Sequence, residues 1–274
     1  MAIQYSAAED DPDADARPKG AALITGAASG IGAAIAGKLA EDGWPVHVCD
    51  AAPDAVAEFA SAHPDIDASV ADVRDPQAAA RVVAHAIAQH GSIGVLINNA
   101  GVAGMTAAIE DVDDDDWRRT IDININGAFY FLKAAAPAMK AAGGGAIINI
   151  ASTAALFGYP QRTAYAASKW ALIGMTKTLA MELGPFGVRV NAVCPGSVEG
   201  PRIDGVIERD AAHRGMAPEE VRRIYESQVS MRRFVTKNDI ADTCAFLASD
   251  RARMISGQVI SVDGHTETLT FPIK

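Results

Sequence analysis

Two residues that can do proton chemistry stand four positions apart in the segment YAASK, Tyr165 and Lys169. Side chains with this spacing share one face of a helix, so a helical segment would set the phenol beside the ammonium. A phenol titrates near ~10, and a nearby cation favours the phenolate by roughly one to three units. Tyr165 is therefore a candidate general acid and base. For an isolated pair of this spacing, the alternative is a core tyrosine and a solvated lysine.

The composition limits the partners and the location that can be expected. The chain has 274 residues, of which 49% are hydrophobic, and a formal net charge of −10. Nucleic acid and anionic membranes bind basic faces, so neither is expected as a partner. Cys49, Cys194 and Cys244 lack C-x-x-C spacing and the histidines lack ligand spacing, so we expect no disulfide framework and no metal. Without an apolar run of membrane-spanning length or a signal pattern, the expected location is the cytoplasm.

Strand and helix patterns alternate from Ala21 onward. Residues 1–19 are acidic and poor in large apolar side chains, which predicts a flexible tail. Strands are predicted near 21–25, 45–50, 67–72, 93–98, 145–150, 187–193 and 258–262, and helices near 30–42, 53–62, 76–90, 114–141, 162–183, 204–228 and 238–249. This alternation predicts an α/β fold, a Rossmann-like doubly wound parallel sheet of about seven strands with helices on both faces. With no repeat or linker, 20–274 are expected to form a single domain.

A glycine-rich turn, TGAASGIG, follows the first strand at 25–32 and opens a helix. Glycines let backbone N–H groups and the helix N-terminus approach a pyrophosphate. Asp50 ends the second strand, where a carboxylate accepts hydrogen bonds from a ribose diol and repels a 2′-phosphate. Ser29 and Ala51 supply no cation for such a phosphate. The pattern favours NAD over NADP, although Asp50 alone could also be an ordinary turn acid.

The spacing T-G-x-x-x-G-x-G, together with the YAASK segment, resembles the short-chain dehydrogenase/reductase family over about 21–264. Further matches follow in the family's order: Asp72-Val73, NNAG at 98–101, Asn124 within INING, Ser152 ahead of Tyr165, and PGSV at 195–198. Each motif alone has an ordinary explanation as a cap, a strand-end hydroxyl or a turn. Their joint order favours the family.

The resemblance implies a role for each matching residue. It assigns Asn124, Ser152, Tyr165 and Lys169 to catalysis. It assigns cofactor contacts to Gly26, Ser29, Gly30, Ile31, Gly32, Asp50, Asp72, Val73, Asn99, Tyr165, Lys169 and Val198. One position departs from the pattern, because Gly200 stands where the family commonly has a threonine that holds the nicotinamide carboxamide. No role is therefore assigned to Gly200.

The implied activity is NAD(H)-dependent interconversion of a secondary alcohol and a ketone. Tyr165 would exchange the proton, Ser152 would bind the reacting oxygen, Lys169 would lower the pKa of Tyr165 and hold the nicotinamide ribose, and Asn124 would hold a water that links Lys169 to solvent. A non-catalytic NAD(H) sensor or scaffold on the same fold is the alternative. The four intact residues argue against it.

The substrate is left open by the sequence. The segment 199–230 is expected to form a lid over the substrate. Arg202 could clamp an anionic group, but acids interleave with the arginines of this segment, a pattern more typical of a solvated helix face. Arg162 is a candidate wall residue, although a surface position is the more common alternative for such an arginine. Phe157, Tyr159 and Met216 could add an apolar side or belong to the core. Helix 170–181 could serve as a subunit interface, and family members commonly pair there, so a homotetramer is expected.

Overall fold

The computed structural model describes residues 20–268, so the predicted acidic tail, 1–19, lies outside the described residues. A parallel sheet of seven strands forms the centre of the described chain, in the order β3-β2-β1-β4-β5-β6-β7. Its strands are β1 Ala21–Thr25, β2 Val46–Asp50, β3 Asp67–Val70, β4 Ile93–Asn98, β5 Gly145–Ile150, β6 Val188–Pro195 and β7 Val259–Val262. The predicted Rossmann-like fold is confirmed.

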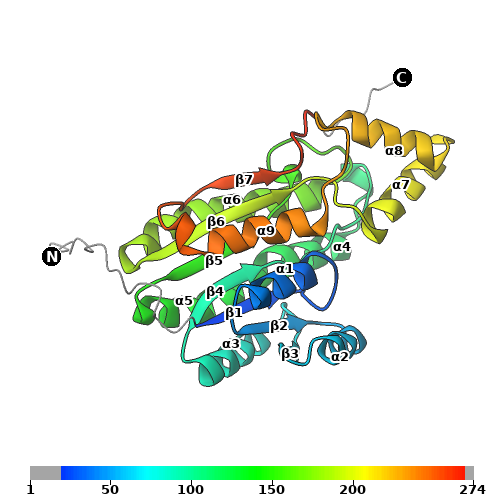
Figure 1. The fold of residues 1–274 in the computed structure, drawn as a ribbon. Helices are drawn as coiled ribbons and strands as arrows, with labels where there is room; N and C mark the ends of the chain where they lie inside the picture. The colour runs from blue at the N-terminus through cyan, green and yellow to red at the C-terminus, as the bar shows by residue number, and fades with distance from the viewer. Residues whose placement is uncertain (1–19, 269–274) are drawn as a thin grey trace.

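Helices cover both faces of the sheet (Figure 1). α1 Gly30–Glu41, α2 Pro53–Ala62 and α9 Lys237–Ala248 pack on one face, and α3 Pro76–His90, α5 Gly127–Ala142 and α6 Thr163–Leu183 pack on the other. The strand order reverses between β1 and β4, which both pair with their neighbours in parallel. In such sheets the crevice at the carboxyl ends of the strands, next to this reversal, is where ligands bind.

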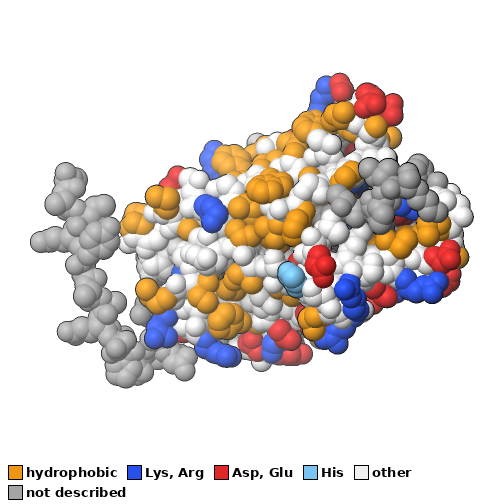
Figure 2. All heavy atoms as spheres, turned by 90° about the horizontal axis from the view of Figure 1, so that it is seen from above, with side chains coloured by type: hydrophobic (Ala, Val, Ile, Leu, Met, Phe, Trp, Pro, Cys, Tyr) orange, Lys and Arg blue, Asp and Glu red, His pale blue; other side chains and the backbone are white. Residues whose placement is uncertain are grey.

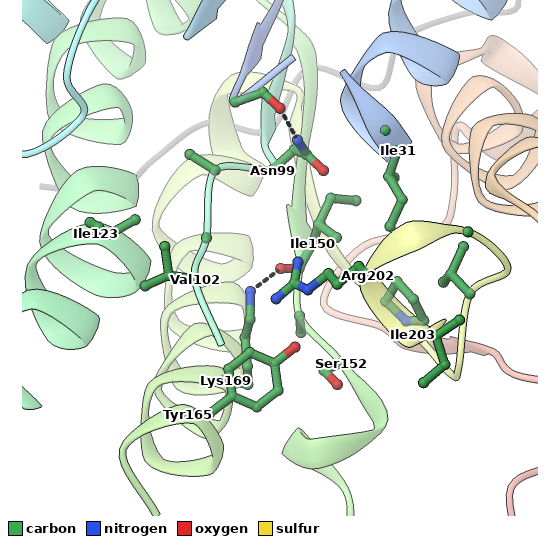
Figure 3. Close-up of a pocket in the computed structure, with 18 of the residues that line it drawn as sticks. Ile31, Asn99, Val102, Ile123, Ile150, Ser152, Tyr165, Lys169, Arg202 and Ile203 are labelled. Carbon is green, nitrogen blue, oxygen red and sulfur yellow. Dashed lines mark hydrogen bonds between the residues drawn. The ribbon is translucent and has the colours of Figure 1, made fainter. Parts of the chain in front are cut away.

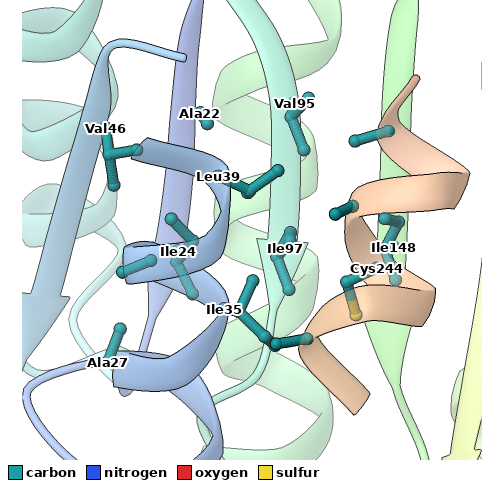
Figure 4. Close-up of a cluster of buried hydrophobic side chains, with 14 of the residues drawn as sticks. Ala22, Ile24, Ala27, Ile35, Leu39, Val46, Val95, Ile97, Ile148 and Cys244 are labelled. Carbon is teal, nitrogen blue, oxygen red and sulfur yellow. The ribbon is translucent and has the colours of Figure 1, made fainter. Parts of the chain in front are cut away.

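The central strands are apolar on both sides because helices bury both faces of the sheet. On the side shown in Figure 4, Ile24 of β1 and Ile97 of β4 pack against Ile35 and Leu39 of α1, and all four are fully buried. Leu23, Leu96 and Ile147 alternate with these residues and contribute to the core cluster on the opposite face. The sheet is therefore a rigid platform whose strand ends hold the polar residues in fixed places.

Two predicted helices are broken, and in this respect the predictions were wrong. The span 114–141 consists of α4 Asp114–Ile121, a five-residue π-helical turn at Asp122–Asn126, and α5. The span 204–228 consists of α7 Pro201–Arg214 and α8 Pro218–Ser227. Gly215 ends α7 with a φ of 63°, in the left-handed region, and Pro218 begins the next helix, so the chain turns between them.

The outer surface combines dispersed charge with several exposed apolar side chains. On the face shown in Figure 2, Lys and Arg side chains lie scattered among acidic and hydrophobic ones. Trp170 and Met181 of α6 and Phe129 of α5 are 51%, 80% and 46% exposed. Among residues 20–268, no helix combines the length and the apolar character that crossing a membrane requires.

Candidate active site

A cavity of about 1020 Å³ opens at the carboxyl ends of the strands. Loops that follow the strands β1 to β6 line it, and the start of α7 closes one side. Its wall includes Gly26, Ser29, Gly30, Ile31, Asp50, Asp72, Val73, Asn99, Ser152, Tyr165, Lys169 and Val198. Of the predicted site residues, only Gly32 and Asn124 are not part of this wall.

The glycine-rich turn is held in place from the neighbouring strand. Asn99, which follows β4, donates from its side chain to the carbonyls of Thr25 and Gly26, at 3.0 and 2.7 Å. A Cβ on Gly32 would lie 2.6 Å from the Asn99 amide nitrogen, so Gly32 permits this close packing rather than facing the cavity. Gly30 has a φ of 60° and open space above it, as a backbone that a phosphate must approach requires.

Two acids lie at the far end of the cavity. Asp50 accepts from the N–H groups of Ala28 and Ala52, at 3.3 and 3.2 Å, so the turn itself orients its carboxylate. Asp72 is paired with Arg74, whose Nε and Nη2 donate to it at 2.6 to 3.1 Å. The hydrogen bond from Arg74 lowers the pKa of the Asp72 carboxyl. Among the described residues, Asp50 forms no ion pair, so its charge is available to a ligand.

Tyr165, Lys169 and Ser152 come together at the other end of the cavity (Figure 3). Tyr165 and Lys169 are one turn apart on α6, and the Lys169 Nζ lies 5.8 Å from the centre of the Tyr165 ring. Lys169 is only 4% exposed and donates to the Ile150 carbonyl at 2.9 Å. Ser152 begins the loop after β5, and its hydroxyl forms a hydrogen bond with the Tyr165 phenol.

The electrostatic environment favours proton exchange at Tyr165. Burial raises the pKa of the phenol, but the charges of Lys169 and Arg202 and the hydrogen bond with Ser152 lower it, and the net direction is downward. Burial also lowers the pKa of the Lys169 ammonium, partly opposed by Tyr165. A phenol with a depressed pKa beside a buried amine is an arrangement suited to general acid and base chemistry.

Asn124 lies behind this site, in the π-helical turn. Its side chain accepts from the Val102 N–H at 2.8 Å and donates to the Val102 carbonyl and the Ser168 hydroxyl, both at 2.9 Å. It therefore joins the loop after β4 to α6 next to Lys169. A π-helical turn is uncommon and is frequently found at functional sites.

The segment after β6 crosses the cavity beside Tyr165. Val198 pairs with Val235 as an isolated bridge, and the N–H of Glu199 donates to the Val235 carbonyl at 2.8 Å. Gly200 follows with a φ of 133°, a conformation that side chains rarely adopt, and there is open space around it. A threonine at this position would be strained in this backbone conformation, which explains the glycine.

Away from the cavity, three polar side chains meet at the edge of the sheet. Their spacing in the sequence did not indicate that they would lie together. Ligand atoms of His47, Asp67 and His85 all lie within 4.8 Å of one another, and the His47 side chain is buried. Burial lowers the pKa of His47 to about 4, so the imidazole is neutral. The three cysteines of the sequence are free and buried. None of these six side chains is part of the cavity wall.

Comparison with known proteins identifies the family. Residues 26–265 match a family model described as enoyl-(acyl carrier protein) reductase. A trans-4-hydroxycyclohexanecarboxylate dehydrogenase from Sinomonas cyclohexanicum is 42% identical over 253 residues, which cover 89% of this chain and 91% of the relative. The chain belongs to the short-chain dehydrogenase/reductase family. The predicted family is thereby confirmed.

Solved structures of other family members agree with this assignment. An NAD⁺-bound xylitol dehydrogenase is 33% identical, with a TM-score of 0.85 and coverage of 91% of this chain and 100% of its own. An actinorhodin polyketide ketoreductase variant with NADPH is also 33% identical, with a TM-score of 0.85 and coverage of 89% and 95%. The predicted reaction class is confirmed: this short-chain dehydrogenase/reductase interconverts a secondary alcohol and a ketone with a nicotinamide cofactor. No finding favours the alternative of a non-catalytic sensor.

Proposed function

We propose that this short-chain dehydrogenase/reductase uses NAD(H) and that Tyr165 is its general acid and base. The observation that carries the proposal is the convergence of the Tyr165 phenol, the Ser152 hydroxyl and the buried Lys169 ammonium at one end of the cavity. The glycine-rich turn and Asp50 lie in the same cavity wall.

The residues of the cavity suit a nicotinamide dinucleotide. The N-terminus of α1 and the open backbone at Gly30 would hold the pyrophosphate, and the Asp50 carboxylate would hold the adenosine ribose. Asp72, Val73 and Asn99 would line the adenosine part, and Val198 would contact the nicotinamide. Asp50 supports NAD, because its carboxylate would repel a 2′-phosphate and the neighbouring Arg74 is already paired with Asp72.

The protein's own residues transfer a proton to and from the reacting oxygen of the substrate. A bound nicotinamide would accept or donate the hydride. In oxidation, the Tyr165 phenolate takes the hydroxyl proton of the alcohol, while Ser152 donates a hydrogen bond to the same oxygen as charge develops on it. Lys169 stabilises the phenolate and would hold the ribose hydroxyls. Asn124 links the loop after β4 to Ser168, the residue before Lys169, and would hold a water beside Lys169.

Three broader features belong to the proposal. The α7 and α8 helices would act as the lid, because α7 begins directly after Gly200 and its first residues line one side of the cavity. Exposed Trp170 and Met181 on α6 support a subunit interface and a homotetramer. The free, buried cysteines support a reducing compartment, the cytoplasm.

The test is NADH formation from a panel of secondary alcohols, run in parallel with NADP⁺. We expect turnover of at least one alcohol with NAD⁺ and a kcat/KM that strongly favours NAD⁺ over NADP⁺. Equal use of the two cofactors would contradict the role of Asp50. Binding of NADH without turnover of any alcohol or ketone would support the non-catalytic alternative instead.

A further inference from the structure

A buried arginine in the cavity wall has no acidic partner in the described part of the chain. Arg162 is 8% exposed and lies immediately before α6, three residues ahead of Tyr165. Its guanidinium carbon is 5.8 Å from the centre of the Tyr165 ring and 5.7 Å from that of Tyr159. The charge is therefore next to the reacting end of the cavity.

The hydrogen bonds of Arg162 leave part of its guanidinium unpaired. Nη1 donates to the Thr106 hydroxyl at 2.5 Å, while the buried Nε has no hydrogen-bond partner among the described residues. The ion pairs of residues 20–268 do not include Arg162. A buried charge without a partner is costly, so a site of this kind is stabilised by an anion that binds there.

An acid near the two tyrosines beside Arg162 already forms an ion pair. Asp210 of α7 is close enough to affect the pKa of both Tyr159 and Tyr225. Its Oδ1, however, accepts from the Arg214 Nε at 2.8 Å. Asp210 therefore forms its ion pair with Arg214, and its buried Oδ2 has no hydrogen-bond partner among the described residues.

The remaining walls around Arg162 are apolar or neutral. Ile203 and Val206 of α7 line the cavity and pack on the small core of the lid helices. Tyr159 and Tyr225 form a hydrogen bond with each other, and burial raises the pKa of both phenols, so neither carries charge near neutral pH. Positive charge beside these apolar and neutral side chains suits a small organic anion with an aliphatic body.

We propose that the substrate of this enzyme is a hydroxy or keto carboxylate with an aliphatic body, whose carboxylate is bound by Arg162 while its carbinol reaches Tyr165 and Ser152. The inference rests on the proposed function and adds the substrate class. A carboxylate pairs with a guanidinium through two parallel hydrogen bonds, and Thr106 occupies only Nη1 of Arg162, while Nε has no partner among the described residues. The carboxylate is unchanged in the reaction; hydride leaves the carbinol carbon and the hydroxyl proton passes to Tyr165.

Arg202 is the competing candidate. It reaches from the start of α7 toward Lys169 (Figure 3), and its charge lowers the pKa of both Tyr165 and Lys169. Arg202 is exposed and lies on the lid, whereas Arg162 is fixed in the wall by Thr106 and by the hydrogen bond from the Ala107 N–H to the Gln161 carbonyl. Arg162 is therefore better suited than Arg202 to form a preformed anion-binding site.

The experiment compares a hydroxycyclohexanecarboxylate with its methyl ester and with cyclohexanol, using the full-length enzyme and NAD⁺. We expect the wild type to favour the acid over the ester by about 10- to 150-fold in kcat/KM, the range for one hydrogen-bonded charge pair. Arg162→Gln keeps a donor for Thr106 without the charge and should lose that preference mainly through KM. Arg162→Lys should retain part of it.

Two controls separate charge recognition from a structural role. Thr106→Val removes the hydrogen bond from Arg162 but leaves the charge, so the preference for the acid should persist. Binding of cyclohexanecarboxylate to the enzyme–NADH complex, followed by NADH fluorescence, should weaken in Arg162→Gln while NADH affinity stays constant. Loss of the preference in Arg202→Met but not in Arg162→Gln would overturn the proposal, as would equal use of acid and ester by the wild type. Failure to oxidise any alcohol would instead count against the proposed function.

Discussion

Replacing Tyr165 with phenylalanine removes one oxygen from the cavity and isolates its contribution. The phenol exchanges a hydrogen bond with Ser152, so folding should lose only about 0.5–1.5 kcal/mol, small against the 5–15 kcal/mol typical of a domain. Proton transfer by a positioned side chain contributes about 10²–10⁴-fold to the rate, which corresponds to about 2.7–5.4 kcal/mol of barrier. We expect kcat to fall by at least this factor in Tyr165→Phe.

The assay should follow NADH formation in single turnovers and measure NADH affinity by fluorescence, because the glycine-rich turn and Asp50 are unaffected by the change. Tyr159→Phe is the matched control, a second phenol in the same cavity. Burial and Tyr165 raise the pKa of Tyr159, so it cannot serve as a base, and its removal should change kcat only a few-fold. The reasoning is refuted if Tyr165→Phe retains a tenth or more of the wild-type kcat, or if the two variants lose activity equally.

Three further substitutions probe other residues of the candidate site. Lys169→Met removes the cation that lowers the pKa of the Tyr165 phenol. The rate of alcohol oxidation, which rises with pH, should therefore rise at higher pH in the variant. An unchanged pH–rate profile would exclude Lys169 from this role. Asp50→Ala should reduce the kcat/KM preference for NAD⁺ over NADP⁺ by about 10- to 150-fold, measured with both cofactors, whereas an unchanged ratio would separate Asp50 from the ribose. Asn124→Ala leaves both Val102 backbone groups without their partner and removes one of the two hydrogen bonds of the Ser168 hydroxyl. It should therefore cost about 1–3 kcal/mol in unfolding free energy and lower kcat, and normal stability in denaturant would contradict this.

The regular parts of the fold were predictable because the sequence repeats a strong local signal. The apolar strands, such as Leu23 and Ile24, are buried from both sides, and the TGAASGIG turn requires conformations that favour glycine, as at Gly30. The breaks in the helices carry weaker signals. The π-helical turn depends on contacts of Asn124 with Val102 and Ser168, which are distant in sequence. The periodicity of the sequence alone therefore predicted an unbroken helix at this point.

The candidate site was predictable to a different degree for each kind of residue. Tyr165 and Lys169 lie one helical turn apart, so local geometry was enough to pair them. The role of Gly32 could not be read from spacing, because it depends on how closely the Asn99 side chain approaches the turn. Contacts of this kind arise only when strands distant in sequence become neighbours in the sheet.

The charge pattern of the sequence does not show which arginines are paired with acids, and the fold does. Arginines and acids interleave along 199–230, a pattern more typical of a solvated face than of an anion site. The structure separates the two cases residue by residue: Arg222 lies near Glu199, Asp204 and Glu226, so its charge is already balanced. Arg162, outside that segment and beside no acid in the sequence, is buried in the cavity wall, and its Nε has no hydrogen-bond partner among the described residues. Because an isolated buried charge is costly, substrate charge rather than size should dominate selectivity in this enzyme.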